Sequence, residues 1–61
     1  MKVYGLFSVV FDDELGEDSD RLLALFMKKE IAELEASSAK ITYSKDFPEN
    51  RFEVRELEVV E

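Results

Sequence analysis

Apolar and aromatic side chains fill both alternating registers of the first stretch of the chain, KVYGLFSVVF, from Lys2 to Phe11. In an extended strand one face would carry Val3, Phe7, Val9 and Phe11. The opposite face would carry Tyr4, Leu6 and Val10. A glycine inside such a strand, here Gly5, marks a bulge or the close approach of another group. This pattern predicts a central strand with two apolar faces.

A strongly acidic segment follows this strand. The residues from 12 to 20 read DDELGEDSD, and we interpret them as a loop around Gly16. The carboxylates of this acidic loop are Asp12, Asp13, Glu14, Glu17, Asp18 and Asp20.

Two interpretations fit the residues after the acidic loop. In the first, RLLALF at 21–26 is a second strand paired with the first, and a helix runs from near Lys28 to about Ser38 or a little beyond. Small side chains at helical spacing would then lie close on the sheet, flanked by Ile31 and Leu34. These small residues are Ala32, Ala36 and Ala39.

In the second interpretation, Ser19 or Asp20 caps one helix over 21–36, and AKITYSK at 39–45 is a strand. Local rules favour this alternative, because Met27 is a poor cap and lysines in a first helical turn oppose the helix dipole. Both interpretations end alike, with a turn at DFPEN (46–50) and a last strand at RFEVRELEVV (51–60). A bulge near Arg55 and Glu56 would bring the apolar residues of that strand onto one face.

The order of these segments resembles a group of short, uncharacterised phage and bacterial domains. The resemblance lies in the opening KVYGLFSVVF, in LLALFMKKEIAELEA, and in the acidic, alternating NRFEVRELEV. It implies two hairpin strands, a helix and a third strand, although Met27 stands where those domains tend to have Ser or Thr, and residues 40–50 have no clear counterpart. We therefore expect one α+β domain over residues 1–61, a three-stranded antiparallel sheet with one helix in the order β-β-α-β, the alternative being β-α-β-β.

The composition argues against several classes of function. The chain has 15 acidic and 8 basic residues, a formal charge of −7, which repels phosphate backbones and anionic lipids. No cysteine or histidine is present, so thiolate metal sites and the usual nucleophile–base pairs are missing. Because 61 residues leave little room for a water-excluding pocket, we expect no catalysis, cofactor or small-molecule substrate. No apolar run approaches the roughly 20 residues that span a bilayer. We expect a cytoplasmic protein, in the host cytoplasm if phage-encoded.

The acidic loop offers many oxygen ligands for a divalent cation, but its spacing does not match an EF-hand. We interpret it as a solvated charge run and expect no metal site.

The remaining candidate is a protein-binding surface, because one helix covers only one face of a three-stranded sheet. The residues that we assign to this surface are Tyr4, Leu6, Val10, Leu57 and Val59. The alternative is that the segment from Ile41 to Phe47 folds back and covers this face. We expect a homodimer and a foreign protein partner. The resemblance implies a small factor that binds and occludes a host or defence protein. The alternatives are a nucleic-acid mimic that fills a basic groove of a nucleic-acid-binding protein, and a structural self-associating module.

Overall fold

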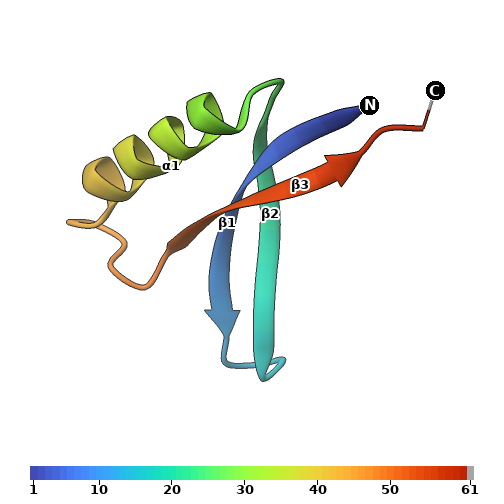
Figure 1. Ribbon diagram of the computed structural model, residues 1–61. Coiled ribbons are helices and arrows are strands. Elements are labelled where there is room, and N and C mark those ends of the chain that lie inside the picture. The colour runs from blue at the N-terminus through green and yellow to red at the C-terminus, as the bar shows by residue number, and fades with distance from the viewer. Residues whose placement is uncertain (61) are drawn as a thin grey trace.

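The computed structural model describes residues 1–60, which form one sheet and one helix (Figure 1). The elements in chain order are β1 (Lys2–Asp12), β2 (Glu17–Phe26), α1 (Lys29–Tyr43) and β3 (Arg51–Glu58). The strands pair antiparallel in the order β2-β1-β3, so the first strand is central. The predicted α+β fold and its β-β-α-β order are confirmed, and the alternative with a helix over 21–36 is wrong.

The loop in the acidic segment is shorter than we predicted, because the chain reverses in a tight turn. The Asp12 carboxylate accepts hydrogen bonds from the backbone N–H groups of Glu14 (2.9 Å) and Leu15 (3.3 Å). Gly16 has a φ of 69°, a left-handed conformation that glycine adopts without steric cost. The chain therefore reverses within four residues, and β2 begins at Glu17 instead of after Asp20.

The helix begins where the first interpretation placed it and ends later, at Tyr43. The predicted stripe of small residues is confirmed, since Ala32 is fully buried and Ala36 and Ala39 are half-buried. The expected packing of Ile31 and Leu34 beside it is not, because these side chains are 46% and 67% exposed. Side chains of this size let the helix backbone lie close to the sheet. Lys40 in the last turn complements the negative end of the helix dipole, which favours continuation through residues 40–43.

The predicted bulge in the last strand is wrong. The pairing of β1 with β3 is unbroken from Lys2↔Glu58 to Val9↔Arg51. The irregularity lies in β2 instead, where Leu23 is the extra residue, because the neighbours Leu6 and Phe7 pair with Ala24 and Leu22. No realignment is needed in β3 because apolar residues line both faces of the sheet.

The core is small and divided between the two faces of the sheet. Its buried hydrophobic residues are Val3, Leu6, Val9 and Ala32. The helix lies beside one end of the sheet, whereas the far end of the β1–β2 hairpin extends beyond both α1 and β3 (Figure 1). The Cα atoms span 37 × 26 × 11 Å, a flat shape that leaves much of the sheet uncovered.

Candidate protein-interaction surface

The five residues that we assigned to an exposed patch do not form one. Leu6 is only 5% exposed, and it lies with the half-buried Tyr4 and Val10 on the face toward α1. Leu57 pairs with Val3 on the opposite face, and Val59 follows the end of β3. Our grouping is corrected because strand alternation sends Tyr4 and Leu57 to different faces, and because the helix covers the first of them.

The sheet face opposite α1, which we call the open face, carries an apolar patch on the part that lies away from the β1–β2 turn. Cross-strand pairs place on this face Val3, Phe7, Leu22, Leu25 and Leu57. Leu22 and Leu25 on the edge strand β2 are 46% and 57% exposed, and no element of the chain covers them. The apolar patch therefore meets solvent mainly along this edge strand, on a face where a larger protein would place a second layer.

Gly5 allows the side chains of the apolar patch to converge over the central strand. A Cβ atom at Gly5 would lie 2.8 Å from Phe7 Cε1, 3.0 Å from Leu57 Cδ1 and 3.2 Å from Leu22 Cδ1. The space that a side chain would fill is thus occupied by neighbours from all three strands. The predicted close approach at this glycine is confirmed, and it makes the patch continuous across the sheet.

Ion pairs cover the part of the open face that lies nearer to the β1–β2 turn. The Arg55 guanidinium donates to Asp20 Oδ2 (2.5 Å) and to Glu53 Oε2 (2.7 Å), and it stacks over the Phe7 ring at 4.6 Å. The hydrogen bond that Arg55 donates to Asp20, and then the one that it donates to Glu53, raise the pKa of Arg55 above its usual value. This network joins β2 to β3 across the central strand and borders the apolar patch with charge.

The acidic residues predicted as one loop have three different roles. Asp12 closes the hairpin turn, and Asp20 pairs with Arg55 as described above. Asp18 pairs with Arg51 at 2.7 Å, again between β2 and β3. The remaining carboxylates, which form no ion pair within residues 1–60, are Asp13, Glu14 and Glu17, and we call them the acidic tip. Within the same range no group of three or more acidic side chains is arranged to hold a metal ion.

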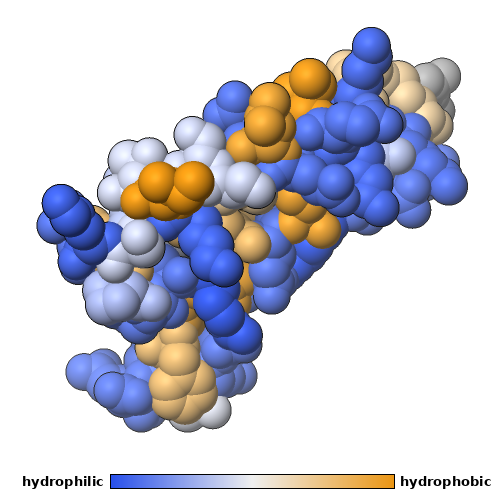
Figure 2. Space-filling model, turned by 60° about the vertical axis from the view of Figure 1, so that its left-hand side comes forward, coloured by the Kyte–Doolittle hydropathy of each residue, from blue (hydrophilic) through white to orange (hydrophobic). Residues whose placement is uncertain are grey.

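Helix α1 also exposes apolar side chains, but these stand apart from the open face. Leu34 and Ile41 are 67% and 78% exposed on the outer side of the helix. Figure 2 turns the end of the helix forward and shows hydrophobic side chains that project from a largely hydrophilic surface. These two leucine and isoleucine side chains are seven residues apart on the helix, with Ser38 between them, whereas the side chains of the apolar patch converge over Gly5.

The sequence indicated more apolar side chains than one helix can cover, but we did not predict which of them would be exposed. Leu22 and Leu25 belong to a segment that we predicted as a strand, but their exposure follows from the edge position of β2. The signal was the apolar character of this segment on both faces, since an edge strand with one covered face leaves the other in water.

The comparisons with known proteins are negative: no family model, no curated protein and no solved structure matches this chain. Within residues 1–60, no helix has the length and apolar character needed to cross a membrane.

Proposed function

We propose that this chain is a small, non-catalytic protein-binding module whose open face is the binding surface. The observation that carries the proposal is the apolar patch, a group of side chains that converges over Gly5 and exposes Leu22 and Leu25, which no other element covers. Exposed apolar surface of this kind, rimmed by polar residues, is typical of protein–protein contact sites.

The total surface area supports the same conclusion. The chain exposes 4876 Å². The scaling of accessible surface with mass gives about 4,100 Å² for a folded monomer of this size. The excess of about 800 Å² equals roughly what one partner buries in a protein–protein interface of standard size. A partner on the open face would bring the molecule to the degree of burial expected of a compact protein.

The arrangement of charge favours an apolar interface over a nucleic-acid mimic. A mimic needs carboxylates spread along one surface at phosphate-like intervals, but Asp18 and Asp20 are already neutralised by arginines within the sheet. The apolar patch with ion pairs at its border has the usual anatomy of an interface, a dry centre and a polar rim. The acidic tip would then accelerate encounter with a basic partner and add little to the strength of the complex.

The resemblance to phage and bacterial domains supports the choice of partner. We propose that the partner is a host or defence protein whose own surface the module occludes. Occlusion needs only a stable contact, and it requires no catalytic group on this chain.

The test is to capture the partner from host lysate and to measure its affinity for matched leucine variants. Leu25→Ser removes an exposed anchor from the open face, whereas Leu34→Ser removes a leucine of similar exposure from the outer side of α1. We expect Leu25→Ser to weaken binding about tenfold or more, as for a central interface residue, and Leu34→Ser to leave it within twofold or so. Equal effects of the two variants would count against the open face.

A further inference from the structure

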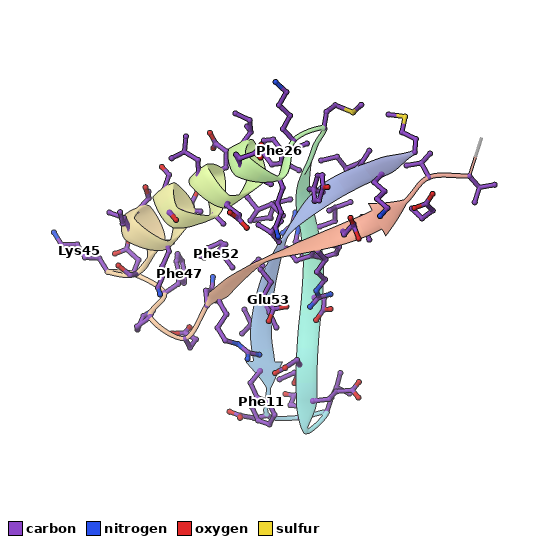
Figure 3. All side chains as sticks on the ribbon, viewed as in Figure 1. Phe11, Phe26, Lys45, Phe47, Phe52 and Glu53 are labelled. Carbon is purple, nitrogen blue, oxygen red and sulfur yellow. The ribbon has the colours of Figure 1, made fainter. Side chains whose placement is uncertain are left out.

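A second apolar feature lies on the helix side of the sheet. The C-terminal end of α1 and residues 44–50 meet the hairpin there and leave a cleft of about 220 Å³. Its aromatic walls are Tyr43, Phe47 and Phe52, with the Tyr43 and Phe52 ring centroids 6.0 Å apart. Figure 3 shows Phe47 and Phe52 together below the C-terminal half of α1.

Backbone hydrogen bonds define the turn that forms one wall of the cleft. The N–H of Phe47 donates to the carbonyl oxygen of Tyr43 at 2.8 Å, and the N–H of Asn50 donates to that of Phe47 at 3.1 Å. These bonds fix the backbone of the turn that carries Phe47 beside the cleft. A preformed site binds more tightly because little side-chain and loop entropy is lost on binding.

The size of the cleft limits what it can hold. Pockets for cofactors and drug-sized ligands measure about 300–1,000 Å³, so this one is too small for a nucleotide. Its volume and aromatic walls match one large apolar side chain, the kind of anchor that fills a pocket at the centre of many interfaces.

Arg21 favours a ligand that carries a negative charge. It lines the cleft and pairs with Ser8 on β1, on the face opposite to Asp20. Among the arginines of residues 1–60, Arg51 and Arg55 form ion pairs and Arg21 forms none. On a chain of charge −7, an arginine without an acidic partner beside an aromatic cleft is complementary to a ligand carboxylate.

We infer that this cleft binds a peptide segment of a partner protein in which a large apolar side chain lies next to a carboxylate. The side chain enters between Phe47 and Phe52, and the carboxylate accepts hydrogen bonds from the Arg21 guanidinium. The inference rests on the proposed function only in taking the ligand to be part of a protein. The cleft and the open face lie on opposite sides of the sheet, so the two sites are separately testable.

The experiment titrates two small probes into the isotope-labelled protein and follows backbone amide shifts by NMR at physiological salt. N-acetylphenylalanine carries the side chain and the carboxylate, and N-acetylphenylalanine amide is its neutral match. At this ionic strength the Debye length is about 8 Å, so the net negative charge of the protein is largely screened. We expect saturable shifts centred on Arg21, Leu23 and Phe52, and an affinity about two- to fivefold higher for the acid than for the amide.

Three variants complete the test. Arg21→Gln should abolish the preference for the acid and leave the amide affinity unchanged, whereas Lys28→Gln makes the same charge change outside the cleft and should preserve the preference. Phe47→Ala should weaken both probes. Shifts elsewhere, no saturation, or equal affinity for acid and amide in the unmodified protein would overturn the inference. Because neither probe involves the open face, those results would leave the proposed function standing, and failure of the Leu25→Ser test would leave the cleft standing.

Discussion

Two leucines on opposite faces of the sheet have opposite roles in this chain. Leu6 is 5% exposed beneath α1 and belongs to the core, whereas Leu25 is 57% exposed on the open face. Both lie in strands rich in apolar residues, so their surroundings in the sequence do not distinguish them. The position of the helix decides which of them is available to a partner.

The leucine pair separates stability from binding. We expect Leu6→Ala to lower the free energy of unfolding by about 2–5 kcal/mol, because it leaves a cavity in a core that has few buried residues. At protein concentrations too low for a dimer to form, Leu25→Ala, which removes an exposed side chain, should change that free energy by roughly 0.5 kcal/mol or less. Urea denaturation followed by circular dichroism measures both. A similar loss in the two variants would mean that the open face is already buried in the free protein.

At the scale of elements, the start of α1 is a weak point in the chain. Lys28 occupies the N-cap position, in an extended conformation, and its side chain makes no capping hydrogen bond. The first helical N–H groups therefore lack the side-chain acceptor that Ser, Thr, Asp or Asn would supply, and a lysine there also opposes the helix dipole.

Replacement of this cap should stabilise the protein. We expect Lys28→Asp to raise the free energy of unfolding by about 1 kcal/mol, since the new carboxylate accepts a backbone hydrogen bond and carries the favourable charge. Lys45→Asp, in the loop after the helix, makes the same charge change without a capping site and serves as the control in a thermal melt. If both substitutions had the same effect, net charge and not capping would be the cause.

The elements themselves could largely be predicted from the sequence, and their details only in part. The alternation from Lys2 to Phe11 and the alanine spacing in the helix report directly on burial, and both predictions are confirmed. The bulge could not be placed, because it depends on the register between β1 and β2 at Leu23. The patch residues were misassigned for a related reason: alternation shows that two faces exist and does not show which one the helix covers.

At the scale of the whole molecule, the uncovered surface predicts self-association in the absence of a partner. We expect a homodimer of the 7.1 kDa chain through the open face at micromolar concentration, because the excess area is about that of one side of a standard interface. Sedimentation equilibrium should give twice the monomer mass for the unmodified protein and for Leu34→Ser, and the monomer mass for Leu25→Ser. A monomer at every concentration would contradict self-association, and a dimer that Leu25→Ser leaves intact would place it on another surface.

The central claim is that apolar contacts on the open face, and not the acidic residues, hold the partner. Its most direct test compares partner affinity between Leu25→Ser and the acidic-tip variant Asp13→Asn/Glu14→Gln/Glu17→Gln, which spares the carboxylates that close the turn or pair with arginine. We expect Leu25→Ser to lower the affinity for the partner about tenfold or more, mainly through faster dissociation. The acidic-tip variant should slow association and lower the affinity by a smaller factor than Leu25→Ser does. The affinity of the unmodified protein should depend only weakly on salt. Binding that the tip variant abolishes, that falls steeply with salt and that survives Leu25→Ser would contradict the claim and indicate a nucleic-acid mimic.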